Sequence, residues 1–225
     1  MDGFEEIDFA EFGDIEIDIE NDFETRYVKP PKTAEIAEHN LKYKDAVKLA
    51  EDIDLKKGER YFCVVNGSFI FGDFIEAYIT KKNVKVKKML ISTLSMSMNN
   101  IDSLANLLNW GYVKDLDLIV SDFFFSHERH MLAKSIYEKL DKDDKFQLAV
   151  AGSHTKICIF ETECGQKIVI HGSANLRSSS NIEQFVIEES EMIYDFNFDY
   201  MSKIVEVYKT INKPIRGGKL WDVIK

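Results

Sequence analysis

The stretch that decides the fold is SHTKICIFETECGQKIVIHGSANLRSSSNIEQ, residues 153–184. Within it, two apolar segments, TKICIFE (155–161) and QKIVIH (166–171), lie on either side of Glu163–Gly165, a spacing typical of a β-hairpin. Polar side chains gather at the beginning of the first segment and at the end of the second. The packing of a hairpin requires none of them, so they indicate a site at one end of a sheet.

Four polar side chains would meet at that end. His154 and Lys156 are two residues apart, as are Ser173 and Asn175, and the strand period of two sends each pair to one face. Gly172 allows the backbone to bend and to approach a ligand closely. An imidazole, an ammonium, a hydroxyl and an amide together suit an anionic, tetrahedral group.

Upstream of the hairpin, strand patterns and helix patterns follow one another. Their spacing is typical of βαβ units, which favours a largely parallel sheet. The expected strands are 60–65, 87–93 and 116–125, and the expected helices are 68–79, 99–110 and 127–140. A further helix is predicted from Thr33, with Ile36, Tyr43, Val47 and Ala50 on one face.

Downstream of Lys145 the pattern changes to strands with short connections. FQLAVA (146–151) precedes the hairpin and IEQFVIE (182–188) follows it. Ser190 is the expected N-cap of a last helix, whose core face would hold Met192, Ile193, Phe196, Tyr200, Ile204 and Tyr208. The prediction is one α/β domain spanning residues 32–225, with a mixed, largely parallel sheet flanked by helices.

The acidic charge of the chain is concentrated at its N-terminus. The formal net charge is −10 over 225 residues, and residues 1–30 alone hold 11 Asp/Glu against 2 Lys/Arg. We therefore expect residues 1–31 to form a solvated, flexible acidic tail, with a short strand or a partner-binding segment as the alternative. The remainder is nearly neutral, so global charge does not favour nucleic-acid binding, and a local basic groove stays open.

No targeting or membrane signal stands out in the sequence. No run approaches the ~20 apolar residues that cross a bilayer, and the acidic start lacks the basic and apolar regions of a signal peptide. A cytoplasmic location without membrane association is expected. The three cysteines form no C-x-x-C pair, which disfavours structural zinc, and Cys158 and Cys164 are interpreted as structural residues with reduced thiols.

The polar pattern is similar to a known signature. H-T-K (154–156) followed by G-S-A-N (172–175) resembles the H-x-K and G-S-x-N elements of the phospholipase D superfamily. Glu161 stands where that family has Asp, at a longer interval than usual from the Gly, and Glu183 resembles the acid that often follows the Asn. The resemblance implies the α/β fold of that superfamily and a phosphodiesterase activity.

The resemblance also implies a mechanism. One histidine, His154, attacks phosphorus and forms a covalent phosphohistidine; a second histidine protonates the leaving oxygen, and water then releases the intermediate. The other implied catalytic residues are Lys156, Asn175 and Glu183, and Ser173 and Gly172 are implied in substrate binding. This chemistry requires neither a metal nor a cofactor.

The chain carries a single copy of the motif, whereas the implied chemistry uses two histidines. The resemblance therefore implies a homodimer with a shared active site, in which each protomer supplies His154. His127 and His130 in SHERH (126–130) are the alternative within one chain. This segment is expected to open a helix, where Arg129 would bind a substrate phosphate.

Taken together, these patterns predict a metal-independent phosphodiesterase. The small size and single motif favour a nuclease among members of the superfamily, with nucleic acid as substrate. A lipid or small-molecule phosphodiesterase is the alternative enzyme, and a nucleic-acid-binding module without catalysis is the alternative of another class. The sequence does not distinguish DNA from RNA.

Overall fold

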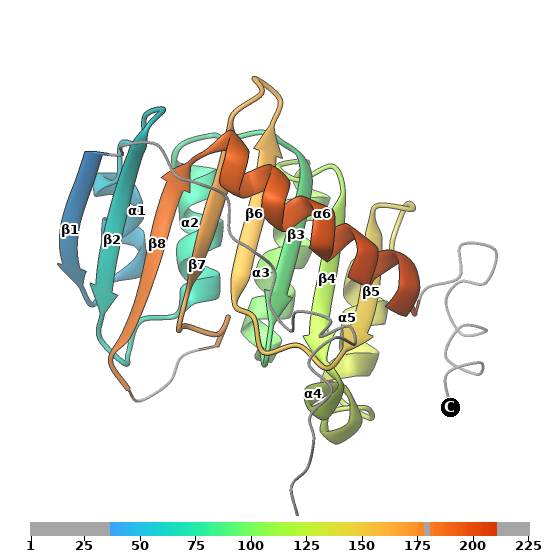
Figure 1. The fold of residues 1–225 in the computed structure, drawn as a ribbon. Helices are drawn as coiled ribbons and strands as arrows, with labels where there is room; N and C mark the ends of the chain where they lie inside the picture. Colours follow the sequence, from blue (N-terminus) through green and yellow to red (C-terminus); the bar gives the residue numbers. More distant parts are fainter. Residues whose placement is uncertain (1–36, 178–180, 211–225) are drawn as a thin grey trace, which may run out of the picture. The chain divides into compact units, whose positions relative to one another are not determined.

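The computed structural model describes residues 37–177 and 181–210, so the expected tail and the first residues of the helix predicted from Thr33 lie outside the described residues. The described residues form an eight-stranded sheet in the order β1-β2-β8-β7-β6-β3-β4-β5 (Figure 1). Its strands are β1 (Ala37–Tyr43), β2 (Glu59–Val65), β3 (Val86–Thr93), β4 (Leu116–Ser121), β5 (Phe146–Ala151), β6 (Ile157–Thr162), β7 (Lys167–Gly172) and β8 (Glu183–Glu189). The helices are α1 (Ala46–Asp52), α2 (Phe71–Lys81), α3 (Met98–Asn109), α4 (Asp122–His127), α5 (Leu132–Leu140) and α6 (Glu191–Tyr208).

The mixed α/β sheet flanked by helices is confirmed, but its parallel pairing is less extensive than expected. β1–β2, β3–β4 and β4–β5 are parallel, whereas β2–β8, β8–β7, β7–β6 and β6–β3 are antiparallel. Antiparallel pairing follows from the connections, because β6, β7 and β8 are joined without the crossover helix that a parallel pair needs. The predicted hairpin is confirmed, with β6 and β7 antiparallel on either side of the turn.

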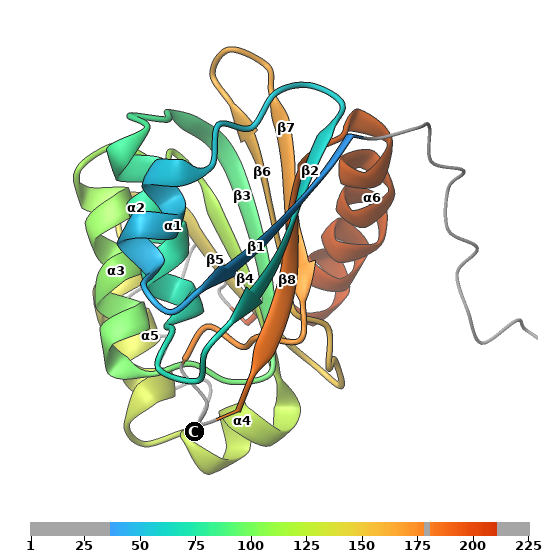
Figure 2. The same cartoon turned by 90° about the vertical axis from the view of Figure 1, so that its left-hand side faces the viewer.

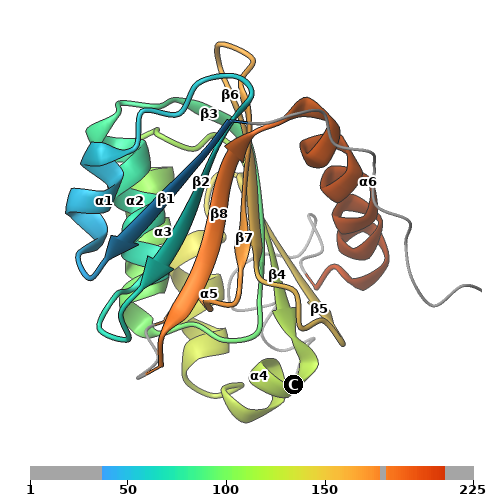
Figure 3. The ribbon, with the colours of Figure 1, turned by 60° about the vertical axis from the view of Figure 1, so that its left-hand side comes forward.

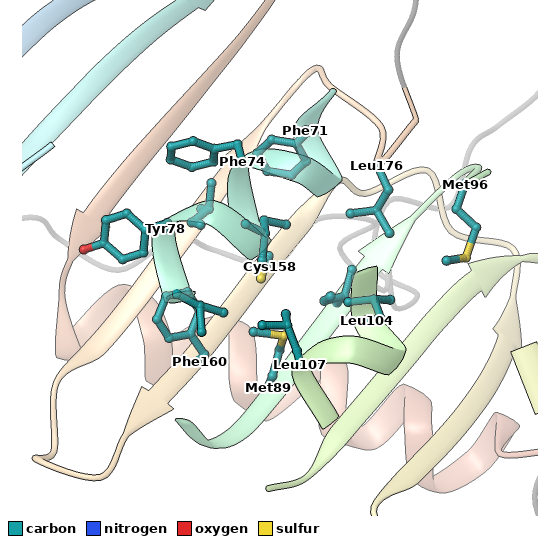
Figure 4. Close-up of a cluster of buried hydrophobic side chains, with 14 of the residues drawn as sticks. Phe71, Phe74, Tyr78, Met89, Met96, Leu104, Leu107, Cys158, Phe160 and Leu176 are labelled. Carbon is teal, nitrogen blue, oxygen red and sulfur yellow. The ribbon is translucent and has the colours of Figure 1, made fainter. Parts of the chain in front are cut away.

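Helices cover both faces of the sheet. α1, α2, α3 and α5 lie on one face, and among the helices of the described residues only α6 lies on the other (Figures 2 and 3). The main core lies under the four helices, where Phe71, Phe74 and Tyr78 of α2 approach Phe160 of β6 and Leu176 of the loop after β7 (Figure 4). A smaller apolar cluster lies under α6 and is formed by Leu90, Ile119, Ala149, Ile159 and Val169 with Tyr194, Met201 and Val205.

The predicted first helix is wrong over its N-terminal part. Residues from Ala37 to Tyr43 form β1, which pairs in parallel with β2, and only the following segment is helical. The Asp45 side chain caps α1 by accepting a hydrogen bond from the Lys48 amide at 2.9 Å, which fixes the helix start there. β1 is nearly fully exposed, so its sequence lacks the alternation of apolar and polar residues that marks a half-buried strand. The sequence therefore assigns its residues to the helix that follows.

Two further boundaries differ from the prediction. The strand expected over 116–125 ends at Ser121, whose hydroxyl accepts from the Phe124 amide at 3.0 Å and begins α4. In α6, the buried residues are Tyr194, Asn197, Met201 and Val205, while Met192 and Tyr208 of the expected core face are exposed. Both faces of α6 carry aromatic residues at helical spacing, so periodicity alone selects neither.

Within residues 37–177 and 181–210, no helix combines the length and the apolar character that crossing a membrane requires.

Candidate active site at the carboxyl edge of the sheet

One edge of the sheet collects the sequence-predicted polar residues. The parallel strands β3, β4 and β5 end at this edge, as do β1, β2 and β7, while β6 and β8 begin there (Figure 1). Ligands of open α/β sheets bind outside the carboxyl ends of the strands, where loops supply the side chains. The edge is therefore the place at which chemistry is expected.

His154 and Lys156 lie in the loop that leads into β6, not on the strand itself as expected. The Lys156 ammonium folds back and donates to the backbone oxygen of His154 at 3.0 Å. This hydrogen bond within the loop holds the ammonium next to the histidine. The alternation of side chains along a strand, which the sequence suggested, is not what brings the two together. His154 is exposed and Lys156 is half-buried.

A hydroxyl cluster, which sequence reasoning missed, anchors this loop. The Thr155 hydroxyl lies 2.7 Å from that of Ser92 at the end of β3 and 2.9 Å from that of Ser153. The Ser153 hydroxyl also accepts from the Thr155 amide at 3.3 Å. The available signal was a Ser and a Thr on either side of His154, because such hydroxyls bond nearby backbone and compete with regular structure.

Asn175 reaches the same place from the other side. Its Oδ1 accepts a hydrogen bond from the Leu94 amide at 3.2 Å. Leu94 follows Ser92 by two residues, and the Ser92 hydroxyl lies 2.7 Å from that of Thr155 in the loop of His154. The amide of Asn175 is thus located beside the loop of His154 and Lys156, with its oxygen engaged and its NH₂ group able to donate.

Ser173 and Glu183 are also brought together. The Ser173 hydroxyl donates to a Glu183 carboxylate oxygen and accepts from the Gln184 amide at 3.1 Å. The Ser173 amide donates to the Gln184 oxygen at 2.9 Å, which ties the end of β7 to the start of β8. The residues predicted from the hairpin region therefore lie at one edge of the sheet, with His154 and Lys156 in a loop and not on the strand.

Glycine at position 172 is required by the packing of two strands, whereas the sequence suggested a close approach to a ligand. A Cβ at this position would lie 2.2 Å from the Gln184 oxygen and 2.6 Å from the Phe185 Cα. Neither atom can move aside without separating β7 from β8, since both belong to backbone. Glycine is therefore required here by contact between neighbouring strands.

Arg129 does not lie at a helix start. SHERH spans the end of α4 and the following turn, and α5 begins only at Leu132, so the predicted helix N-terminus at this position is wrong. Arg129 is half-buried and engaged with other residues. In α4, the His127 ring packs on Phe123 with 4.0 Å between ring centroids, and its Nδ1 lies 2.8 Å from the Phe123 oxygen.

Glu161, at the position of the family acid, lies at the far end of β6 from the site. Its carboxylate pairs with Lys87 at 2.8 Å. Glu161 lies five positions beyond Lys156, about 17 Å along a strand. Glu161 thus links β6 to β3 and cannot contact a substrate that is held by His154.

A buried charge network lies on the α6 face of the sheet. Glu188 of β8 is 1% exposed; the Arg60 guanidinium donates to its carboxylate at 2.8 Å, and His171 lies 3.5 Å from its other oxygen. Burial acts to raise the pKa of Glu188, but the hydrogen bonds from His171 and Arg60 outweigh it and hold the pKa below its ordinary value. His171 on β7 thus contacts Glu188 on the neighbouring strand β8.

The cysteines occupy the positions expected of structural residues. Cys158 is fully buried in the main core, and burial raises the pKa of its thiol well above the ordinary value. Cys164 is exposed in the turn of the hairpin. In the part of the chain that the structure describes, no group of three or more His, Cys, Asp or Glu side chains is placed to hold a metal ion.

No protein-family model matches the sequence, and no curated protein matches it. Solved structures do resemble the fold: the phospholipase D family member Nuc from Salmonella typhimurium (14% identity, TM-score 0.44), polyphosphate kinase from Porphyromonas gingivalis (10%, 0.49) and phosphatidylserine synthase from Haemophilus influenzae (14%, 0.49). The matches cover 56%, 76% and 68% of this chain. They cover 82% of Nuc but only 30% of the kinase and 40% of the synthase.

One of the three, Nuc, is a phospholipase D family member, the family that the H-x-K and G-S-x-N pattern resembles. Identities of 14% or less and TM-scores below 0.5 leave substrate and chemistry to be argued from the site itself.

Proposed function

We propose that the protein is a metal-independent phosphodiesterase that cleaves nucleic acid through a covalent phosphohistidine. The observation that carries the proposal is the convergence of His154, Lys156 and Asn175 on one edge of the sheet. A nucleophile, a cationic donor and a neutral amide donor in one place fit the needs of phosphoryl transfer.

Each side chain has a definite task in the proposed reaction. The His154 imidazole attacks phosphorus, a P–N bond forms, and the bond between phosphorus and the leaving oxygen breaks. Lys156 and the NH₂ group of Asn175 stabilise the negative charge on the non-bridging oxygens, and the backbone contacts of both residues keep them in place. Water then attacks phosphorus and regenerates free His154.

The leaving oxygen needs a proton from a second group. We propose that this proton comes from His154 of a second copy of the chain, across a two-fold axis that brings the two edges face to face. The within-chain alternative is His127 on α4, which follows β4 at the same edge. The two models differ in whether one chain holds a complete site.

The test of catalysis is hydrolysis of bis(p-nitrophenyl) phosphate and of labelled oligonucleotides in EDTA. His154→Ala is expected to reduce turnover by at least about 10³-fold, roughly 4 kcal/mol of barrier. Cys158→Ser is the matched control, because its thiol lies in the core and touches no substrate. A folded His154→Ala protein that keeps most of its activity would contradict the assignment, and binding without turnover by the wild type would indicate a non-catalytic module.

The shared site is tested by mixing. Wild-type and His154→Ala chains are unfolded together, refolded and assayed at fixed total protein. If each site needs both histidines, activity follows the square of the wild-type fraction, and an equal mixture keeps about a quarter. A linear dependence, with about a half remaining, would refute the shared site and favour His127.

A further inference from the structure

A hollow lies at the same edge of the sheet, where β1 and β2 end. Its volume is about 440 Å³, and its lining includes Lys42, Lys44, Val64, Asn66 and Ile182. None of these residues belongs to the candidate active site described above. The hollow combines two ammonium groups, one amide and an apolar surface.

Its position continues the line of the active site. Tyr43 pairs with Val65, and Val65 pairs with Glu183, whose carboxylate accepts from Ser173. The ends of β1, β2, β8 and β7 are thus successive neighbours along one edge. At ~4.8 Å between strands, the end of β1 is about 19 Å from the start of β6, where the loop of His154 leads in. That distance corresponds to about six nucleotides of a stacked strand, at ~3.4 Å each.

Among the described residues, no side chain forms an ion pair with the two lysines of the hollow. Neither Lys42 nor Lys44 forms an ion pair with any residue in 37–177 or 181–210, and both are exposed. The acids nearby are engaged elsewhere: Asp45 caps α1, and Glu183 is bonded to Ser173. Two such ammonium groups in a chain of net charge −10 form a local site for anions.

The apolar part of the lining argues for a ligand with bases. Ile182 is 77% exposed, the highest value among the exposed large apolar side chains of the described residues, and it lies beside the two lysines. The Asn66 oxygen accepts from the Ser68 amide and hydroxyl at 3.0 and 3.1 Å, which directs its NH₂ group away from that turn as a donor. A phosphate chain without bases would use the lysines but not the isoleucine.

We propose that this hollow is a substrate subsite for single-stranded nucleic acid, which holds phosphates and a base about six nucleotides from the bond that is cleaved. The proposal rests on the function proposed above and adds to it a direction and a minimum length of substrate. The bound nucleic acid would run along the carboxyl edge of the sheet, from the loop of His154, past β7, β8 and β2, to the end of β1.

The test is the double variant Lys42→Ala/Lys44→Ala beside a control of equal charge, Lys57→Ala/Lys142→Ala. Lys57 precedes β2 and Lys142 precedes β5, so the control lysines lie at the opposite edge of the sheet. The measurements are kcat/KM for a twelve-nucleotide oligothymidylate and for bis(p-nitrophenyl) phosphate, which is too small to reach the hollow. We expect kcat/KM for the oligothymidylate, divided by kcat/KM for bis(p-nitrophenyl) phosphate, to fall about tenfold in the test variant and to stay unchanged in the control.

Salt dependence gives a second readout. Loss of two phosphate contacts is expected to reduce the slope of log kcat/KM against log salt by about 1.4 for a single strand. An unchanged ratio and an unchanged slope would overturn the subsite, even when the wild type cleaves both substrates and the proposed function holds. Failure of the proposed function would instead appear as absence of turnover with either substrate.

Binding measured without turnover distinguishes a ligand with bases from a chain of phosphates alone. Fluorescence anisotropy with labelled oligothymidylate, in a His154→Ala background, is expected to show weaker binding for both the lysine double variant and Ile182→Ser. Inorganic polyphosphate as competitor is expected to lose affinity with the lysine variant only. If Ile182→Ser changes the affinity for oligothymidylate and for polyphosphate by the same factor, the contact between Ile182 and a base is refuted.

Discussion

Gly172→Ala is expected to destabilise the protein more than any exposed glycine substitution in the same region. The new Cβ would meet the Gln184 oxygen at 2.2 Å and the Phe185 Cα at 2.6 Å, both on the backbone of β8. Ordinary contacts need about 3.5 Å, so the strands must separate by about 1 Å at this point.

The cost can be worked from the contacts at the end of β7. Forced overpacking costs about 1–3 kcal/mol, and the hydrogen bond of 2.9 Å from the Ser173 amide to the Gln184 oxygen contributes about 1 kcal/mol. We expect a loss of about 3 kcal/mol in the free energy of unfolding. For a chain of this size, this corresponds to about 6–12 °C in Tm.

Urea unfolding and thermal melts followed by circular dichroism measure the effect. The matched control is Gly152→Ala, two residues before His154, where the new Cβ would lie 3.9 Å from an Asp122 carboxylate oxygen, an ordinary contact. Its expected change is within about 0.5 kcal/mol. Equal midpoints for the two variants would refute the claim that strand contact is what requires glycine at 172.

Two further predictions concern charges away from the reaction. The pKa of Glu188 is lowered in the fold, so its charge stabilises the protein above the unfolded value near 4.5, and this contribution is lost as pH falls through the folded pKa. Arg60→Met should lower the free energy of unfolding by about 3 kcal/mol near neutral pH and make the unfolding midpoint less dependent on pH between about pH 5 and 3. If the midpoint of the variant falls with acid as steeply as that of the wild type, the ion pair of Arg60 with Glu188 does not lower the pKa of Glu188. Glu161→Gln should leave kcat/KM within about twofold, because its partner is Lys87, and a large loss of activity would place this carboxylate in the reaction.

The strong strand patterns and the hairpin could be predicted from the sequence. The strands β2, β3 and β5 each contain a stretch rich in apolar residues, YFCVV, MLI and LAVA, and the turn of the hairpin is marked by its glycine. The exposed strand β1 could not be recognised, because its pairing with β2 rather than burial decides its conformation. The face of α6 was undecided for a related reason, since aromatic residues at helical spacing occur on both sides.

For the candidate site, the sequence by itself determined which residues are proposed to carry chemistry: His154, Lys156 and Asn175 stand in a pattern that packing does not require. Only the tertiary structure decided how they meet. The loop position of Lys156 depends on a backbone oxygen, the placement of Asn175 depends on the amide of Leu94, and the hollow of Lys42 depends on three strand ends becoming neighbours. The contact of Asn175 and the lining of the hollow join segments that are far apart along the chain, and the order of strands in the sheet, which local propensity does not encode, brings them together.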